Sequence, residues 1–491
     1  MIDVLARRVR ASPDATALIA TDGREWSYRE LDERVKRTAG RLAALGVAGE
    51  HLGCLLETRP ATVVLVHAAA RLGCVLVPLN TRLTPETLAE QIERADLAAL
   101  VCGSDTAATA VELSAEIPIV SVDAAERVDV RDLDKISPAA FTPAERDADE
   151  PALMLATSGT TGEPKLVVLM TENLRASAVA SAFRLGVAPD DRWLDPLAPY
   201  HMGGFAPIVR SALYGTAVVV PEAGFDAGAT LDALDSYDCT GVSLVPTMLR
   251  RLLDAGPLPD SLRFVLLGGA PASEGLIERC EERGVPVHPT YGMTETASQV
   301  ATATPEEAFA HAGTVGRPLF DTDLQILDGD GESVATGEAG EIVVSGPTVF
   351  SRYYGDPDAT ARAFSERGFH TGDVGHRDAG GRLWVTGRRD ELISTGGELV
   401  APTEVADALR SHPAIHGASV VGLPDPEWGE RVGALVVGDV SDTETVRIHC
   451  RERLAGFKVP RTIGFADELP RTASGTVERE AVRERLLEIG E

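Results

Sequence analysis

The segment Leu153–Val168 concentrates residue types that can bind a chain of phosphates. Two apolar runs enclose six small or hydroxylated residues, and a lysine, Lys165, follows them. The six are Thr157, Ser158, Gly159, Thr160, Thr161 and Gly162. Glycines let the backbone curl around a ligand with its N–H groups pointing inward, and hydroxyls add further donors. Lys165 would supply a point charge for the phosphates. A plain Ser/Thr/Gly surface turn is the alternative, but its position between two strand-like runs favours a phosphate-binding loop.

The order of residues in this loop excludes the P-loop of nucleotide triphosphatases. In that loop the lysine directly follows a glycine and is followed by Ser or Thr. Here Glu163 and Pro164 come before Lys165, and a second strand-like run follows it. The string resembles the phosphate loop of the adenylate-forming superfamily, which includes acyl-CoA synthetases and the adenylation domains of peptide synthetases.

A second group of residues, Tyr291-Gly292-Met293-Thr294-Glu295, is suited to magnesium bound to phosphates. Mg²⁺ takes one or two carboxylates together with phosphate oxygens, and Glu295 beside Thr294 offers such a set. The apolar run Phe264–Leu267 ends in Gly268 and Gly269, where a backbone without side chains permits close contact with a ligand. Together these segments resemble the superfamily's second signature and imply that they line the ATP site.

A third group lies at Phe369–Asp373 and continues to Asp390. A lone Thr-Gly-Asp is most often a turn. The superfamily resemblance implies that Asp373 binds the ribose hydroxyls, that Arg388 contacts the nucleotide, and that Asp390 is a hinge. The resemblance covers essentially the whole chain.

The resemblance implies a two-step reaction with ATP, Mg²⁺ and coenzyme A. The carboxylate of a small-molecule acid attacks the α-phosphorus of ATP, which gives an acyl-adenylate and pyrophosphate, and a thiol then displaces AMP. Two differently charged steps in one site call for two electrostatic arrangements, which the family achieves by rotating its small lobe about the hinge.

The carboxy-terminal signature departs from the family pattern. The family sequence PxTxSGKxxR places a catalytic lysine after the glycine, whereas here Thr476 follows Gly475. Three explanations stay open: Lys458 or Arg471 substitutes for the lysine, the first step runs more slowly, or the chain is an impaired paralogue. The intact motifs favour an active enzyme with Lys458 among its candidate catalytic residues.

We expect the unsubstituted chain to form the adenylate, and the substitution Thr476→Lys separates the explanations. A gain of about tenfold or more in pyrophosphate release would indicate a site weakened by the missing charge. An unchanged rate would indicate that another cation already acts there.

The loop Pro199–Phe205 lies where the family places its acyl pocket. His201 on this loop is a candidate gate or substrate contact, with a structural histidine as the equal alternative. The segments around Val245 and Tyr291 resemble o-succinylbenzoate–CoA ligases of menaquinone biosynthesis. An aromatic dicarboxylate needs a donor-rich spot for its second carboxylate, and Arg210 and Gln299 are candidate donors.

Other functions stay open at this point. The chain could be a ligase for another aryl or medium-chain acid. It could also be a stand-alone adenylation domain that charges a carrier protein, or a non-catalytic nucleotide-binding paralogue. Pyrophosphate release with and without coenzyme A distinguishes these readings.

The charge of the chain limits its partners. The 491 residues carry 75 acidic and 46 basic side chains, a formal net charge of −29. Nucleic acid and anionic membranes are therefore poor partners. Lysine is scarce, with only Lys36, Lys135, Lys165 and Lys458. An acidic, lysine-poor surface favours a halophilic host, because concentrated salt screens self-repulsion. An acidic mesophile with GC-rich coding is the alternative.

The cysteines and the apolar segments indicate a cytoplasmic protein without a membrane span. The six cysteines form no CxxC pair and read as small core residues in a reducing compartment. The amino terminus lacks a signal-peptide core. His67 and Arg71 interrupt the most apolar region, Ala61–Leu79, which argues against a membrane helix. A homodimer is a further expectation.

The pattern of runs predicts an α/β fold. Helical stretches alternate with short apolar runs up to about Ala270, which indicates βα units and parallel sheets. Short, Gly-rich alternating segments after Ile326 predict a small β-barrel. We therefore expect a large N-terminal lobe, residues 1–388, with two βα subdomains and the barrel. A small, mobile α+β lobe follows at residues 389–491, with ATP between the lobes.

Overall fold

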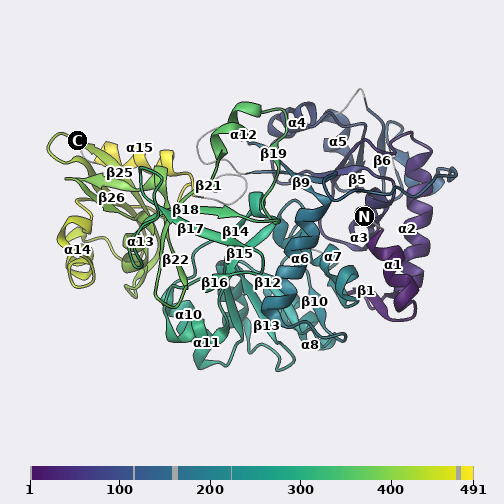
Figure 1. The fold of residues 1–491 in the computed structure, drawn as a ribbon. Coiled ribbons are helices and arrows are strands. Elements are labelled where there is room, and N and C mark those ends of the chain that lie inside the picture. Colours follow the sequence, from purple (N-terminus) through teal and green to yellow (C-terminus); the bar gives the residue numbers. More distant parts are fainter. Residues whose placement is uncertain are drawn as a thin grey trace. The chain divides into compact units, whose positions relative to one another are not determined.

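The fold comes from a computed structural model, which describes residues 3–113, 117–125, 127–157, 164–222, 224–471 and 477–489. Figure 1 labels the helices and strands. Contacts divide the chain into two compact units. The first unit holds residues 1–272, 276–323 and 344–369, and the second holds residues 273–275, 324–343 and 370–491. Each unit is described by itself.

The first unit contains an eight-stranded sheet that ends in the hairpin of the predicted phosphate loop. Its strands in spatial order are β19 (Arg352–Tyr353), β9 (Leu166–Met170), β8 (Pro151–Ala156), β4 (Val75–Pro78), β3 (His51–Leu55), β5 (Ala99–Cys102), β6 (Ile119–Ser121) and β7 (Arg131–Asp132). The strands from β8 to β7 pair in parallel, whereas β9 and β19 run antiparallel to their neighbours. The predicted parallel sheet is thus present.

A nine-stranded sheet forms the second layered subdomain of this unit. Its strands in order are β16 (Arg317–Pro318), β15 (Ser298–Thr302), β14 (Val287–Met293), β13 (Phe264–Leu267), β12 (Gly241–Leu244), β10 (Arg192–Leu194), β11 (Ala217–Val220), β1 (Thr16–Ala20) and β2 (Glu25–Ser27). Strands β1 and β10–β14 pair in parallel, and β15, β16 and β2 are antiparallel. The candidate glycines and Glu295 follow β13 and β14.

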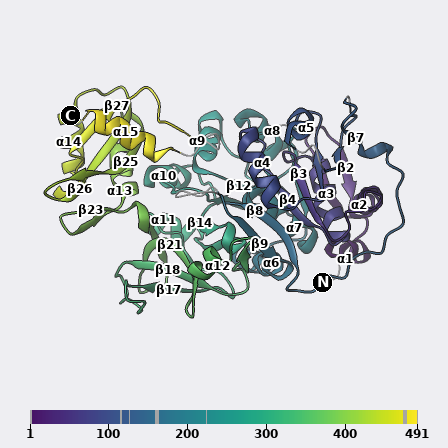
Figure 2. The same cartoon turned by 90° about the horizontal axis from the view of Figure 1, so that it is seen from above.

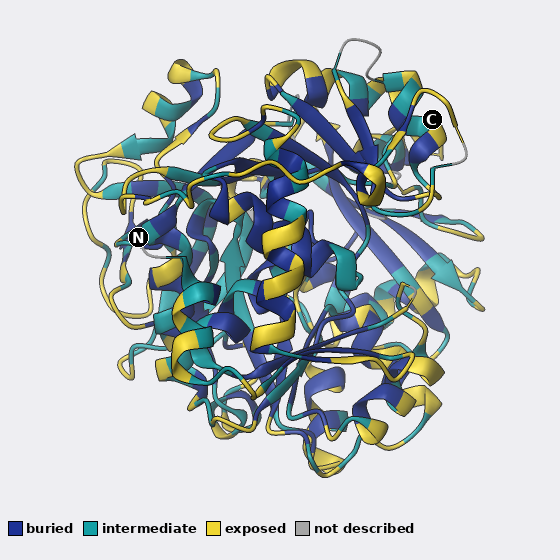
Figure 3. Ribbon diagram, turned by 90° about the vertical axis from the view of Figure 1, so that its right-hand side faces the viewer, coloured by how far each residue is buried: buried dark blue, intermediate teal, exposed yellow. Residues whose placement is uncertain are grey.

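Helices cover both sheets, and most expose one face (Figure 3). They are α1 (Val4–Ala11), α2 (Tyr28–Ala43), α3 (Pro60–Arg71), α4 (Pro85–Arg94), α5 (Ala107–Leu113), α6 (Thr171–Leu185), α7 (Met202–Tyr214), α8 (Ala227–Ser236), α9 (Pro246–Ala255), α10 (Glu274–Glu282), α11 (Pro305–Ala310) and α12 (Pro357–Ala363). Their ends follow from local chemistry. For α2, Ser27 Oγ accepts from the Glu30 N–H, and the Glu30 carboxylate accepts from the Ser27 N–H, which forms a capping box.

The apolar helix α3 is a core helix of the first unit. Its Arg71 is 2% exposed and donates to Asp32 at 2.6 Å and to Asp3 at 2.5 Å. A charge this deep needs paired, hydrogen-bonded partners, and the two aspartates provide them. Among the described residues, no helix is long and apolar enough to cross a membrane.

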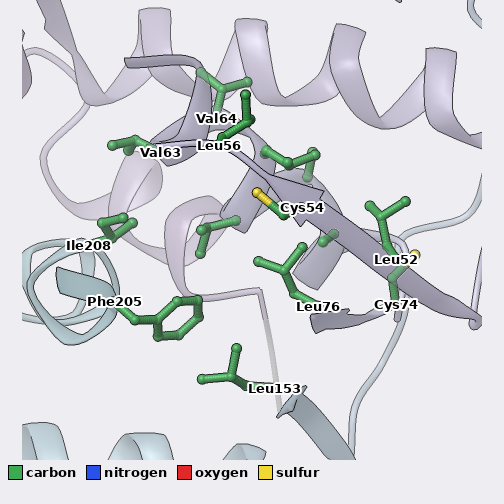
Figure 4. Close-up of a cluster of buried hydrophobic side chains, with 14 of the residues drawn as sticks. Leu52, Cys54, Leu56, Val63, Val64, Cys74, Leu76, Leu153, Phe205 and Ile208 are labelled. Carbon is green, nitrogen blue, oxygen red and sulfur yellow. The ribbon is translucent and has the colours of Figure 1, made fainter. Parts of the chain in front are cut away.

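The two sheets share a core across α3 and α7. Figure 4 shows Phe205 and Ile208 of α7 in one buried cluster with Leu52 and Cys54 of β3 and Leu153 of β8. These side chains are at most 3% exposed. The helix α7 is therefore held by strands of the eight-stranded sheet as well as by those of its own.

The described residues of the second unit form three α-helices, one small sheet and most of another, whose strand β20 (Phe364–Ser365) lies in the first unit. The region predicted as a barrel forms a sheet ordered β17 (Asp323–Leu327), β18 (Gly340–Ser345), β21 (Gly368–Arg377) and β20 (Phe364–Ser365), with β22 (Leu383–Arg388) also on β21. The last sheet is β24 (Glu398–Val400), β23 (Ile393–Thr395), β26 (Gly429–Gly438) and β25 (Ile415–Asp425), with β27 (Thr462–Phe465) on β26. The helices are α13 (Pro402–Arg410), α14 (Thr443–Arg451) and α15 (Arg479–Ile489), and α13 and α15 pack on β25 (Figure 2).

Candidate active site

The predicted phosphate loop connects the two strands of a hairpin. β8 and β9 pair antiparallel from Met154 and Val168 to Ala156 and Leu166. At the top of the hairpin, the Thr157 N–H donates to the Lys165 carbonyl at 2.9 Å, which closes the loop. Ser158, Gly159, Thr160, Thr161 and Gly162 lie outside the described residues. The structure thus places the two ends of the loop, Thr157 and Lys165, beside each other.

Lys165 and Glu295 are brought together by a tyrosine. The exposed Lys165 Nζ lies 4.9 Å from the centre of the Tyr353 ring, within cation–π range. The Tyr353 hydroxyl donates to Glu295 Oε1 at 3.1 Å. Tyr353 is placed by β19, where it pairs with Val167 of β9, and the Phe350 N–H donates to the Glu295 carbonyl at 2.7 Å. The lysine suited to phosphate and the carboxylate suited to Mg²⁺ therefore share one neighbour.

The turn that presents Glu295 is unusually tight. Thr294, Glu295 and Thr296 form one 3₁₀ turn, and the next two residues, Ala297 and Ser298, have φ of 51° and 116°. A non-glycine φ in this region costs free energy and is frequent at functional sites. The half-buried Glu295 carboxylate beside the Thr294 hydroxyl fits the donor types that Mg²⁺ takes together with phosphate oxygens.

Glycines let the backbone of β14 and β13 come close to their neighbours. A Cβ on Gly292 would lie 1.6 Å from the Ser298 carbonyl oxygen, so the β14–β15 bulge beside Tyr291 and Met293 requires glycine. A Cβ on Gly268 would lie 2.8 Å from the Thr290 side chain, and Gly269 follows with φ of 77°. The carboxyl ends of β13 and β14 therefore present bare backbone, as expected for close approach of a ligand.

A small cavity of about 10 Å³ lies between α6, α7 and the turn that follows Glu295. Its lining residues are Leu174, Ser177, Met202, Ala206, Val209, Arg210 and Ala297. Arg210 is 7% exposed and donates to Ser177 Oγ at 3.0 Å, and Ser177 donates to the Ala297 carbonyl at 2.6 Å. Among the described residues, no carboxylate pairs with Arg210, and burial lowers the pKa of its guanidinium.

The other two acyl-pocket candidates differ in exposure. Gln299 is 2% exposed, donates to Thr302 Oγ1 at 2.8 Å, and leaves its Oε1 without a partner among the described residues. His201 is exposed and precedes the first turn of α7, where its carbonyl accepts from the Gly204 and Phe205 N–H groups. Desolvation by the groups packed around the ring lowers the pKa of His201, and the positive charge of Arg82 lowers it further.

Asp195, directly after β10, is a buried carboxyl group that sequence reasoning missed. It is 0% exposed, and neither oxygen has a hydrogen-bond partner among the described residues. Burial raises the pKa of the Asp195 carboxyl group well above its ordinary value of 3.8. The folded chain therefore keeps a proton that the unfolded chain releases above that pH, so this group makes the fold less stable as the pH rises.

The substitution Asp195→Asn is expected to raise the melting temperature at pH 8 by about 2 °C or more. The gain shrinks as the pH is lowered toward 5, because the proton that the folded carboxyl group takes up costs less free energy as the pH approaches the unfolded pKa. Thermal unfolding from pH 5 to 8 measures this. Asp191→Asn is the control: Asp191 pairs with Arg263 at 2.5 Å, so its loss lowers the melting temperature instead. A pH-independent gain at Asp195 would contradict a protonated group.

The predicted nucleotide-sugar residues cluster within the second unit. Asp373 and Arg388 face each other across β21 and β22. Arg388 donates to the Thr371 carbonyl at 2.9 Å, and its Nη1 lies 3.4 Å from Asp373 Oδ1. Its Nε lies 3.6 Å from Asp390 Oδ1. Asp373 is 7% exposed and pairs with Arg388, and its carboxylate can accept hydrogen bonds from two hydroxyls.

Lys458, the candidate substitute for the missing signature lysine, forms an ion pair in the second unit. Its Nζ lies 2.7 Å from both carboxylate oxygens of Glu404. This carboxylate offsets part of the positive charge that Lys458 would offer to a substrate. Thr476 lies outside the described residues.

Sequence reasoning missed two residues that connect the site. Tyr353 stands in a short Arg-Tyr-Tyr-Gly segment, and a single aromatic residue has no spacing signature. Ser177 lies on α6 among other small residues, and its link to Arg210 depends on tertiary packing. The sequence does show that α7 has no acidic residue three or four positions from Arg210, which indicates that this arginine has no ion-pair partner on its own helix.

Known proteins match the chain over nearly its whole length. The AMP-binding enzyme family matches residues 5–354, and the AMP-binding enzyme C-terminal domain matches residues 404–476. The 2-succinylbenzoate–CoA ligase of Bacillus mycoides (strain KBAB4) is 37% identical over 99% of this chain and 98% of that protein. The o-succinylbenzoate CoA synthetase of Bacillus subtilis, solved with the acyl-adenylate OSB-AMP, is 35% identical and covers 98% of both chains with a TM-score of 0.91. The same enzyme with ATP and a magnesium ion gives 35% identity, 99% coverage of both chains and a TM-score of 0.90.

Proposed function

The chain belongs to the AMP-binding enzyme family, and on that premise we propose that it is an ATP-dependent acid–CoA ligase that acts on 2-succinylbenzoate. The family, the α/β fold and the use of ATP, Mg²⁺ and coenzyme A that the motifs predicted are confirmed by these relatives. The reaction is a step of menaquinone biosynthesis. It joins an aromatic dicarboxylic acid to coenzyme A and releases AMP and pyrophosphate.

The geometry that best supports this acid is that of Arg210, a buried arginine that pairs with no carboxylate among the described residues. A dicarboxylate presents one carboxylate to ATP and must place its second one elsewhere. Arg210 is a permanent cation in a 7% exposed position, and it borders the cavity next to the turn that carries Glu295. A buried cation without an anion is costly, and a carboxylate of the substrate would remove this cost. Gln299, with its unsatisfied oxygen, lies on the neighbouring strand β15.

The residues of the first unit are arranged for the adenylation step. The substrate carboxylate attacks the α-phosphorus, the bond to the β-phosphate oxygen breaks, and pyrophosphate leaves. Lys165 would supply positive charge to the phosphates, and the carboxylate of Glu295, with Thr294 beside it, would hold Mg²⁺. When bound, Mg²⁺ offsets the negative charge of the phosphate oxygens. Tyr353 contacts both the Lys165 ammonium and the Glu295 carboxylate.

The thioester step follows on the same acyl carbon. The thiolate of coenzyme A attacks the carbonyl carbon of the adenylate, and the bond to the AMP oxygen breaks. Asp373 and Arg388 hold the nucleotide through both steps, in the roles that the family resemblance assigns to them. His201 at the start of α7 is proposed as a contact of the acyl group.

Pyrophosphate release with MgATP tests the proposed function. The assay compares 2-succinylbenzoate, benzoate and octanoate, each with and without coenzyme A, in high salt. Release with 2-succinylbenzoate and formation of its CoA thioester are expected. Release with another acid alone would keep the mechanism and reject the substrate, and bound ATP without release for any acid would indicate a nucleotide-binding paralogue.

We propose that residues 389–491 move as a lobe about Asp390. The support is the position of Asp390 in a single 3₁₀ turn, Arg389–Glu391, between β22 and β23. Hydrogen bonds from Thr403 Oγ1 to the Thr386 carbonyl at 2.7 Å and from Arg389 Nη1 to Glu341 Oε2 at 3.2 Å cross this boundary. Distances between spin labels on either side of Asp390, measured with ATP and then with coenzyme A, test the movement.

We also propose a halophilic host, which the net charge of −29 supports. Salt shortens the Debye length from about 10 Å at 0.1 M to about 3 Å at 1 M, and this screens the repulsion between carboxylates. The melting temperature is therefore expected to rise between 0.1 and 2 M KCl and to rise less in sorbitol of matched osmolality. An equal rise in both solutes would contradict the charge explanation.

A cytoplasmic location stays a proposal, supported by the cysteines. All six are free and buried, as expected in a reducing compartment. The homodimer is likewise a proposal, and sedimentation of the purified protein tests it.

A further inference from the structure

Glu57 connects the two sheets of the first unit beside the candidate acyl pocket. It lies in the loop between β3 and α3, and its Oε1 accepts hydrogen bonds from Thr81 Oγ1 and from the Tyr200 hydroxyl, the latter at 3.1 Å. Thr81 follows β4 of the same sheet, whereas Tyr200 follows β10 of the nine-stranded sheet. One carboxylate oxygen therefore joins loops from three strand ends.

The loop that Tyr200 belongs to is held at a second point by the residue after Glu57. Thr58 Oγ1 donates to the Leu197 carbonyl at 2.5 Å. The first turn of α7 packs back on the same loop, because a Cβ on Gly204 would lie 2.4 Å from the carbonyl oxygens of Leu197 and Ala198. Residues 197–201 and the start of α7 thus form one packed piece, and Tyr200 is its 5% exposed anchor.

This piece fixes the helix face that lines the cavity. Met202, Ala206 and Arg210 lie four residues apart on α7 and all border that cavity. His201 comes immediately before Met202, and its ring lies 5.0 Å from that of Tyr200 in an edge arrangement. A shift of Tyr200 would therefore move both the His201 ring and the near end of the cavity-lining face.

We propose that Glu57 is a positioning residue for acid binding, which acts through Tyr200 to hold the His201 loop and the first turn of α7. The inference rests on the proposed function, because it assigns this loop to the acid. Glu57 touches no reacting atom in this role. Its contribution is to keep the acid-binding face of α7 in register, so that the free protein does not have to order the loop when the acid binds.

Four variants separate positioning from charge and from general stability. Glu57→Ala removes both hydrogen bonds, Tyr200→Phe removes one, and the double variant removes the pair. Glu57→Gln keeps an acceptor oxygen but removes the charge that raises the pKa of His201. The control is Tyr28→Phe, which removes a buried hydroxyl that donates to the carbonyls of Ser211 and Thr216 at the far end of α7.

The first readouts are KM for 2-succinylbenzoate, kcat and the Kd of ATP. We expect Glu57→Ala and Tyr200→Phe each to raise KM for the acid by about tenfold, with the Kd of ATP unchanged. The double variant is expected to be no worse than the poorer single variant, because both remove the same contact. Glu57→Gln is expected to stay within about threefold of the wild type in KM for the acid. An equal rise of KM in Tyr28→Phe, or full additivity in the double variant, would overturn the proposal.

A second readout does not depend on catalysis. The His201 ring resonance, assigned by its loss in His201→Gln, is measured in histidine-labelled protein without substrates. It is expected to shift in Glu57→Ala and Tyr200→Phe and to stay in place in Tyr28→Phe. If the wild type releases no pyrophosphate with any acid, the proposed function fails. This measurement still tests whether Glu57 and Tyr200 position the His201 loop. An unshifted His201 resonance in both Glu57→Ala and Tyr200→Phe would overturn the inference.

Discussion

Replacing Glu295 by glutamine is expected to slow adenylate formation by about 10²–10³-fold. The substitution keeps the size of the side chain and its acceptor for the Tyr353 hydroxyl, but it removes the negative charge that binds Mg²⁺. The tight turn with its positive φ values at Ala297 and Ser298 is unchanged, so the loss belongs to the charge. Single-turnover pyrophosphate release measures the step, and the Mg²⁺ concentration for half-maximal rate is expected to rise as well.

Two further variants delimit this prediction. Tyr353→Phe removes the 3.1 Å hydrogen bond to Glu295 but leaves both the carboxylate and the aromatic ring near Lys165, so a loss of only about tenfold is expected. Glu112→Gln changes an exposed carboxylate on α5 and controls for the loss of one acidic charge. A Glu295→Gln enzyme with a normal rate and a normal Mg²⁺ requirement would show that another group holds the metal.

Much of the fold is predictable because local pattern and tertiary structure agree. The apolar run Phe264–Leu267 forms strand β13. The segment Pro402–Arg410, whose pattern predicts a helix, forms α13, and in both cases the predicted bounds are those of the structure. In each case the boundary is marked by a residue that stops or starts the element, Gly268 after the strand and Pro402 at the first helical position. The residue pattern predicts a further helix from about Thr443 to Ala455, whereas α14 ends at Arg451. After Arg451, the N–H groups of Arg453 and Leu454 both donate to the Cys450 carbonyl, and the chain leaves the helix there. A periodic pattern does not encode such a local change.

The site is less predictable because its contacts join distant strand ends. Motif chemistry selects Lys165 and Glu295, but Tyr353 joins them through β19, a strand of only two residues. Likewise, Arg71 reads as a break in an apolar run, and its partners Asp3 and Asp32 come from other parts of the chain. Such pairs have no fixed spacing. The sequence does indicate that such a residue has a partner, since burying a charge in an apolar helix without one costs free energy.

Arg210 extends this argument to the substrate, and its removal is expected to change which acid the enzyme prefers. In Arg210→Met, kcat/KM for 2-succinylbenzoate is expected to fall by about 10²-fold or more, because the second carboxylate would lose its buried charge partner. For benzoate, which has no second carboxylate, kcat/KM is expected to change by less than about threefold. Methionine fills a similar volume and leaves Ser177 bonded to the Ala297 carbonyl, so the melting temperature is expected to hold or rise.

The ratio of the two kcat/KM values separates recognition from damage to the helix. Arg210→Lys retains a charge but loses the planar fork, and an intermediate ratio is expected. Arg184→Met on α6 is the matched control, because that half-buried arginine instead donates to the carbonyls of Arg317 and Pro318. An equal loss for both acids in Arg210→Met would make Arg210 a structural residue of α7. A loss confined to 2-succinylbenzoate would mean that Arg210, which pairs with no carboxylate among the described residues, takes its anionic partner from the substrate.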